Sequence, residues 1–188
     1  MEGNNQINIK RELPIHIVGI SASGISGLSL PIQKIIQSTK KLSAPRRVLS
    51  SLKDWWASQN SQDPFPDFFE SDKPMKLINW LKQHDEQSVV LASGDPLWFG
   101  IGRVLLDHFP SDKLVFHPSP TSLQLAFSRL AIPWQDACWI SLHGREASPL
   151  IKLLQKQPET IGILTDPNKG GAKEVKDILY ALKLENIY

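Results

Sequence analysis

Short apolar runs alternate with helical patterns along most of this chain, and this alternation constrains the fold more than any other feature. The run Ile15-His-Ile-Val-Gly-Ile20 is β-rich and ends in a Ser/Gly-rich turn, and similar runs lie at 88–92 and 114–116. The segments after these runs carry apolar residues at helical spacing. Strands that alternate with helices form βαβ units around a largely parallel sheet. The sequence therefore predicts an α/β protein.

The second half of the chain continues the alternation with fewer strands. We predict strands at 138–142 and 161–165, with helices before, between and after them. The break at Pro118-Ser119-Pro120 is the best position for a domain boundary. The C-terminal domain is expected to be incomplete, because a sheet usually needs three or more strands to be stable alone. The expected organisation is a disordered leader at 1–13, an N-terminal α/β domain at 14–117 and a C-terminal α/β domain at 118–188.

Three local expectations concern loops and helix starts in the first half. Residues 63–70 carry two prolines and three aromatic residues, which predicts a loop with aromatic anchors. Asp72 is expected to cap a helix that runs from Lys73 to His84. Asp95 followed by Pro96 is typical of a helix N-cap and first helical residue.

Composition excludes several classes of protein. The chain has 188 residues, with 41% hydrophobic and 21% charged, so it can bury a core. The net charge of +2 is too balanced to suggest nucleic acid binding. A single cysteine, Cys138, excludes a disulfide framework and a multi-cysteine metal site. No apolar run approaches the roughly 20 residues of a membrane span. We expect a cytoplasmic protein that binds no metal, membrane or nucleic acid.

Two glycine-containing turns follow predicted strands, at Gly19-Ile-Ser-Ala-Ser-Gly24 and Ser93-Gly94-Asp95-Pro96. Both would lie at the carboxyl edge of one parallel sheet, where open α/β proteins bind ligands. The first turn fits neither nucleotide motif, because Ile25 replaces the phosphate-binding lysine and Ser21 replaces the middle glycine of a dinucleotide fingerprint. Turn geometry and helix capping are simpler explanations of the two turns.

The run Ser141-Leu-His-Gly-Arg145 ends another predicted strand. No second histidine stands at metal-ligand spacing from His143, and Cys138 forms no zinc pattern with it. No Gly-x-Ser-x-Gly elbow is present, which argues against acyl-serine chemistry. The residues alone favour a packed or surface role for His143 over a catalytic one.

Several segments, in order along the chain, resemble the tetrapyrrole methylases. Leu91-Ala-Ser-Gly-Asp-Pro-Leu-Trp-Phe-Gly-Ile-Gly-Arg103 resembles the Gly-Asp-Pro signature of that family, and 18–29 matches its first loop in position. The run 126–137, followed by 141–145, is similar to the precorrin-6Y branch, which methylates carbon 5 of the corrin precursor in cobalamin synthesis. The resemblance extends from about Ile15 to the end of the chain.

This resemblance implies a two-domain α/β fold that holds S-adenosylmethionine (SAM) between its domains and methylates C5 of a precorrin. His143 and Asp95 are the candidates for a general base, and Arg103, Arg129 and Arg145 are candidates to bind substrate carboxylates. Matched by position, the expected donor-binding residues are Gly19, Ala22, Ser93, Gly94, Asp95, Trp98, Thr121, Ser122 and Thr165.

The sequence also departs from the family pattern. Ser21 replaces a usual glycine, and 118–122 replaces a run that normally begins Pro-Gly. The chain stops at Tyr188, where the family's second domain normally continues, so we expect a truncated and marginally stable domain. The resemblance also allows the chain to form a homodimer. Two alternatives remain open: a non-catalytic or decayed fragment, and another SAM-dependent methylase on the same fold.

Overall fold

The computed structural model describes residues 13–59, 64–143, 145–166 and 171–182. The predicted leader lies, except for Leu13, outside these residues. The chain divides into two compact units, Met1–Thr121 and Ser122–Tyr188.

Among the described residues, the first unit is built on a five-stranded sheet in which every paired strand is parallel, with the order β3-β2-β4-β1-β5. The three strands predicted from apolar runs in this unit, β1, β4 and β5, lie side by side within it. The predicted α/β class with a parallel sheet is confirmed. The strands are β1 (Ile15–Ile20), β2 (Lys41–Ala44), β3 (Asp67–Glu70), β4 (Ser88–Ser93) and β5 (Leu114–His117).

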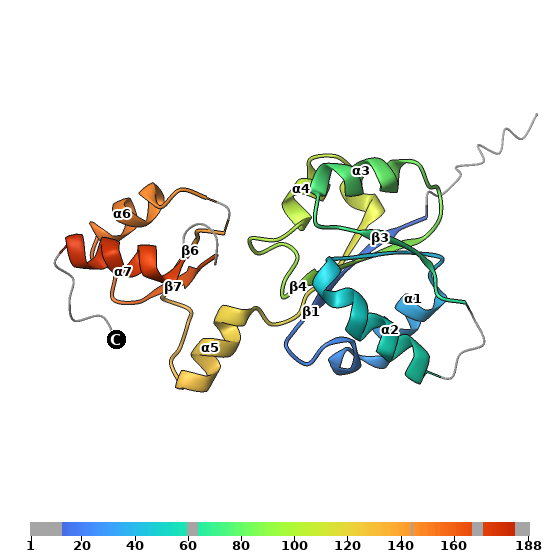
Figure 1. Ribbon diagram of the computed structural model, residues 1–188, viewed down its shortest axis with the longest axis horizontal. Helices are drawn as coiled ribbons and strands as arrows, with labels where there is room; N and C mark the ends of the chain where they lie inside the picture. Colours follow the sequence, from blue (N-terminus) through green and yellow to red (C-terminus); the bar gives the residue numbers. More distant parts are fainter. Residues whose placement is uncertain (1–12, 60–63, 144, 167–170, 183–188) are drawn as a thin grey trace, which may run out of the picture. The chain divides into compact units, whose positions relative to one another are not determined.

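Helices cover both faces of this sheet, with α3 and α4 on one side and α1 and α2 on the other (Figure 1). Alternate residues of a strand point to opposite faces. Ile17 of β1 therefore packs among the residues of α3 and α4, while Val18 packs against α1 and α2. The helices are α1 (Leu30–Ser38), α2 (Leu49–Ser58), α3 (Pro74–Lys82) and α4 (Gly102–Leu106), with short 3-10 turns at Ile25–Gly27, Arg46–Val48 and Ser111–Lys113.

Two strands of the sheet were not predicted. The expectation of a loop at 63–70 is wrong for its second half, because β3 forms there and pairs with β2. Phe68 packs into the core on the α1 and α2 side, and Phe69 packs into the core on the other side. Consecutive aromatic residues therefore serve both faces of a strand, a pattern that resembles loop anchors when only the local sequence is considered.

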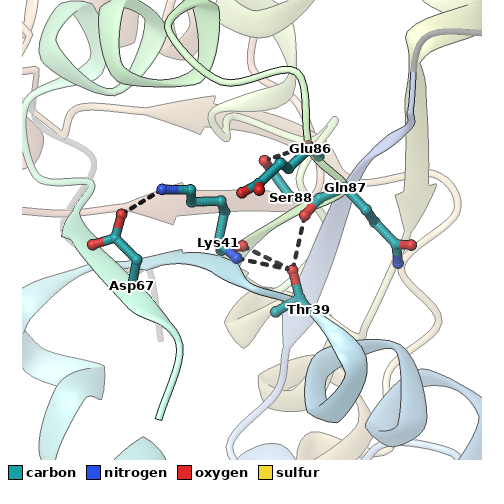
Figure 2. Close-up of polar contacts among 6 residues, drawn as sticks. All are labelled: Thr39, Lys41, Asp67, Glu86, Gln87 and Ser88. Carbon is teal, nitrogen blue, oxygen red and sulfur yellow. Dashed lines mark hydrogen bonds and ion pairs between the residues drawn. The ribbon is translucent and has the colours of Figure 1, made fainter. Parts of the chain in front are cut away.

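The amino edge of the sheet is held together by a buried threonine (Figure 2). The Thr39 hydroxyl lies 3.0 Å from the Lys41 carbonyl oxygen and 3.1 Å from that of Gln87. The Lys41 ammonium in turn pairs with the Asp67 carboxylate at 2.7 Å. These contacts join the end of α1 to the starts of β2, β3 and β4.

The second unit contains a two-stranded parallel sheet, as its two predicted strands required. Trp139 packs on Phe127 of α5, with ring centroids 5.1 Å apart, and Gly162 leaves room for the indole. The opposite face packs around buried Leu142, Leu150 and Leu154. The elements are α5 (Ser122–Leu130), β6 (Cys138–Ser141), α6 (Ser148–Leu154), β7 (Ile161–Leu164) and α7 (Ala172–Ala181).

Replacing Thr39 with valine tests the amino-edge contacts. Thr39→Val keeps the side-chain volume but removes the donor shared by two carbonyl groups. We expect the free energy of unfolding, measured by urea denaturation, to fall by about 1–3 kcal/mol. Thr39→Ser keeps the hydroxyl and should retain most of the stability. A valine variant as stable as the wild type would contradict the role assigned to this hydroxyl.

Candidate functional site

Three loops of the first unit leave neighbouring strands at the carboxyl edge of the parallel sheet. β1 lies between β4 and β5, with Ile20 opposite Ser93 and Val18 opposite His117. The segments that follow these strands therefore emerge side by side. In open α/β sheets this edge is where ligands bind.

The first two loops touch through their backbones. The Gly94 N–H donates a hydrogen bond to the Ile20 carbonyl oxygen at 2.8 Å. A Cβ atom on Gly19 would overlap the Gly94 carbonyl oxygen and lie 2.8 Å from the Ser119 nitrogen. The Ser119 hydroxyl donates to the Gly19 carbonyl oxygen at 2.8 Å and brings in the third loop. Glycine at position 19 is thus required by a backbone crossing, which we call the loop junction (Gly19, Gly94, Ser119 and Thr121).

Position 94 also requires glycine, for a different reason. Its φ of +62° lies in the left-handed region, and a Cβ there would come within 3.0 Å of the Thr121 Cα. Both Gly94 and Thr121 are buried. The junction therefore fixes the Gly-Asp-Pro segment against the end of the first unit.

The expected helix cap at Asp95 and Pro96 is wrong, because α4 begins only at Gly102. The Asp95 carboxylate accepts the Leu97 N–H at 2.9 Å and so closes a tight turn. The chain then folds back, and the Gly102 N–H donates to the Pro96 carbonyl oxygen at 2.8 Å. A side chain at Gly102 would crowd that same carbonyl. The segment is a compact loop where the local sequence predicts a helix start.

The structure places the expected site residues in two groups. In the first unit Gly19, Gly94 and Thr121 meet in the junction, Asp95 and Trp98 are half-buried beside it, and Ala22 and Ser93 are exposed. The remaining expected residues are exposed side chains, with Arg103 in the first unit and Ser122, Arg129, His143, Arg145 and Thr165 in the second.

Sequence analysis missed a cation at this edge. Arg47 follows β2, the neighbour of β4, and its guanidinium donates a hydrogen bond to the Ser93 hydroxyl. Asp72 was expected to cap a helix, and this expectation is wrong. Its carboxylate accepts the Arg46 backbone N–H at 2.9 Å, while α3 starts with no side-chain cap. Because β2 has no clear strand signature, nothing in the local sequence placed Arg47 beside the Gly-Asp-Pro loop.

In the second unit a histidine and a buried carboxylate meet at the carboxyl edge of the smaller sheet. β6 and β7 are paired with Ser141 opposite Leu164, so the segments after them emerge together. His143 Nδ1 lies 2.8 Å from Asp166 Oδ2. The imidazole side chain is 74% exposed and the carboxylate 11%. Asp166 was also missed, although its position just after a predicted strand was a usable signal.

A pair of histidines joins β1 to β5. His16 Nδ1 and His117 Nε2 are 2.9 Å apart, and the two rings are nearly parallel. Burial lowers the pKa of both imidazoles, and the charge of His117 adds to the effect on His16. The fold therefore favours the neutral pair next to the loop at 118–121.

Among the described residues, no helix combines the length and apolar character that a membrane crossing requires. The same residues include no group of three or more His, Cys, Asp or Glu side chains that can hold a metal ion.

The family profile described as Tetrapyrrole (Corrin/Porphyrin) Methylases matches residues 14–187. The chain belongs to the tetrapyrrole methylase family. The resemblance inferred from the Gly-Asp-Pro segment is thereby confirmed. Gly94 of the loop junction lies in the segment that resembles the family's signature.

Two curated tetrapyrrole methylases share sequence with this chain. A Sinorhizobium protein named precorrin-6Y C(5,15)-methyltransferase [decarboxylating] is 29% identical over 129 residues, which is 69% of this chain and 30% of that protein. A Salmonella typhimurium cobalt-precorrin-7 C(5)-methyltransferase is 37% identical over 70 residues, which is 37% of this chain and 35% of that protein. The matched segments thus span about a third of each of these relatives.

Two solved structures share the fold. The methyltransferase CobJ superposes with a TM-score of 0.65 at 13% identity, covering 90% of this chain and 76% of that one. The precorrin-6Y methylase CbiE from Archaeoglobus fulgidus gives a TM-score of 0.57 at 20% identity, covering 82% of this chain and 73% of that one. At these identities the similarity supports the architecture of the tetrapyrrole methylase, and the residues of the site must be argued from this chain.

Two substitutions, in β1 and in the loop after it, test the loop junction. Gly19→Ala should lower the free energy of unfolding in urea by about 1–3 kcal/mol, because the new methyl group forces two backbones apart. Ser26→Ala is the control, since Ser26 is exposed in the loop after β1. This control should stay within about 0.5 kcal/mol of wild type. Equal effects of the two changes would show that the crossing is not tight.

The His16–His117 pair predicts a pH dependence of stability. Both pKa values are lower in the folded chain than the ordinary value of 6.5, so below that value the unfolded chain binds more protons. The contribution of this pair to the free energy of unfolding is therefore full above about pH 6.5. It decreases as the pH falls below that value towards the folded pKa values. Urea midpoints at pH 7.5, 6.5 and 5.5 should fall less in the double variant His16→Gln/His117→Gln. Identical slopes in both proteins would contradict this.

Proposed function

We propose that this protein transfers the methyl group of SAM to C5 of a precorrin in cobalamin biosynthesis. The observation that carries the proposal is the loop junction, in which Gly94 of the Gly-Asp-Pro segment meets the end of β1 and the loop after β5 at the carboxyl edge of the sheet in a tetrapyrrole methylase. The named activities of the Sinorhizobium and Salmonella relatives support the choice of substrate.

The residues around the junction fit a donor that is held mainly by backbone groups. Gly19 and Gly94 leave no room for side chains, and the exposed neighbours Ala22 and Ser93 are small. Half-buried Trp98, four positions after Gly94, adds an aromatic side chain to the same loop. We assign donor binding to these residues with Asp95 and Thr121. For Ser122 and Thr165 in the second unit, donor binding stays an expectation from the resemblance.

Bound SAM supplies an activated methyl group, and the electron pair of the broken C–S bond stays on sulfur when that group forms a bond to the ring carbon. The chain's main contribution is to hold the two reactants in line, which can supply roughly 7–11 kcal/mol. The rigid junction suits this task because its backbone hydrogen bonds fix the loops before a ligand arrives.

A methylated ring carbon that carries hydrogen must release it as a proton, and the geometry favours His143 over Asp95 as the acceptor. The Asp95 carboxylate is engaged by the Leu97 N–H within its own turn. Asp166 is placed to accept the Nδ1–H of His143, which leaves Nε2 as the basic atom on an exposed ring. The electron pair of the C–H bond returns to the ring system. Asp166 is then a positioning residue, since it acts through the imidazole.

Substrate carboxylates require cations, and exposed Arg103, Arg129 and Arg145 remain candidates to bind them.

Three measurements test the proposed function. Calorimetry should detect binding of S-adenosylhomocysteine, and transfer of a ¹³C-labelled methyl group to a precorrin should be seen by NMR. His143→Gln should leave the Kd for S-adenosylhomocysteine unchanged and lower the single-turnover rate about 10²- to 10⁴-fold. His84→Gln, at the end of α3, is the matched control and should behave as wild type.

Rescue by a small external base separates a base from a structural histidine. Added imidazole should restore part of the single-turnover rate of His143→Gln and leave the rate of His84→Gln unchanged. Asp166→Asn should lower the rate less than His143→Gln, because the base remains but its tautomer is no longer fixed. A wild-type chain that binds no S-adenosylhomocysteine would refute the methyltransferase assignment, and an absence of rescue would remove His143 from it.

A further inference from the structure

The loop after β2 is held in place by hydrogen bonds from the segment after β3. The Ser71 N–H donates to the Ala44 carbonyl oxygen at 3.0 Å, and the Arg46 N–H donates to the Asp72 carboxylate at 2.9 Å. Within the loop, the Val48 N–H donates to the Pro45 carbonyl oxygen at 2.9 Å. The backbone that carries Arg47 is therefore fixed on both sides of that residue.

The Arg47 side chain is aimed at the Gly-Asp-Pro loop. Its guanidinium donates to the hydroxyl of Ser93, the last residue of β4 and the one before Gly94. Both side chains are exposed. Since β2 and β4 are neighbours in the sheet, the contact lies along the same edge as the loop junction. Arg47 thus places a positive charge next to the start of the proposed donor-binding loop at Ser93.

This charge has no anionic partner among the described residues. Ser93 is neutral, and the acid that contacts this loop, Asp72, is engaged by a backbone N–H. A guanidinium carries five N–H donors in a planar fork, and a single hydroxyl uses only a small part of them. The geometry of the fork matches a carboxylate, which it can bind through two parallel hydrogen bonds.

We propose that Arg47 binds a carboxylate of the ligands that occupy this edge. The inference rests on the proposed function, which supplies two sources of that group: the acidic side chains of the tetrapyrrole and the methionine carboxylate of the donor. Arg47 differs from the three arginines predicted from the sequence in contacting a residue of the donor loop itself. The carboxylate replaces the weak hydroxyl contact and draws the ligand towards the loop junction.

The experiment compares Arg47→Gln with Arg46→Gln by calorimetry on the full chain. Arg46 is the adjacent arginine, and its side chain is exposed. The probes are S-adenosylhomocysteine, cobyrinic acid with its free carboxylates, and the full methyl ester of cobyrinic acid. If the tetrapyrrole supplies the carboxylate, wild type should bind the acid more tightly than the ester. Arg47→Gln should then weaken binding of the acid about 10- to 100-fold and abolish that preference.

If the donor supplies the carboxylate, Arg47→Gln should instead weaken binding of S-adenosylhomocysteine by a similar factor, with corrin binding unchanged. Arg46→Gln should keep wild-type affinities in either case, and equal losses in both variants would reduce the effect to general electrostatic attraction and overturn the site. Unchanged affinities in Arg47→Gln, or a wild type that binds none of the probes, would overturn it too.

If wild type binds cobyrinic acid but no S-adenosylhomocysteine, the proposed methyl transfer fails on its own. A preference for the acid over the ester that disappears in Arg47→Gln would still support the carboxylate site. The two proposals can therefore fail separately.

Discussion

The parallel pairing of β1 with β4 and β5 is the constraint on which the rest of the first unit depends. It sets Ile20 opposite Ser93 and Val18 opposite His117, and so determines which loop residues meet. The crossing of Gly19 and Gly94 follows directly from this register. A shift by one residue would turn the apolar side chains of β1 to the wrong faces and also separate the two glycines.

The two edges of the sheet have different roles: contacts at the amino edge stabilise the fold, and loops at the carboxyl edge form the candidate site. At the amino edge, buried Thr39 and the Lys41–Asp67 pair join chain segments to one another. At the carboxyl edge, the polar groups belong to loops that cross closely and expose small residues. This division gives the molecule a rigid base for a site that relies on backbone positions more than on side-chain identity.

What the sequence could predict depended on whether a signal was local. Runs such as 15–20 are apolar because both faces of the strand are buried, and this shows in the residues themselves. Lys41–Ala44 becomes a strand only because β3 and β4 flank it, a cause that lies elsewhere in the chain. The Gly-Asp-Pro loop was recognised through its motif, but its turn resembles a helix start because an Asp-Pro pair serves equally well to close a tight turn. Arg47 and Asp166 were missed because their roles arise from tertiary contacts.

The loop junction also ties the site to the folding order of the chain. The Ser119 hydroxyl and the Gly19 carbonyl that it contacts are separated by 100 positions in the sequence, and the paired histidines by 101. Contacts between residues so far apart require closure of a long loop, whose entropy cost must be met before the contact forms. The junction therefore forms only after β5 has docked on β1. A nascent chain that already contains the Gly-Asp-Pro segment still lacks the third loop, so ligand affinity should arise late in folding and nearly all at once.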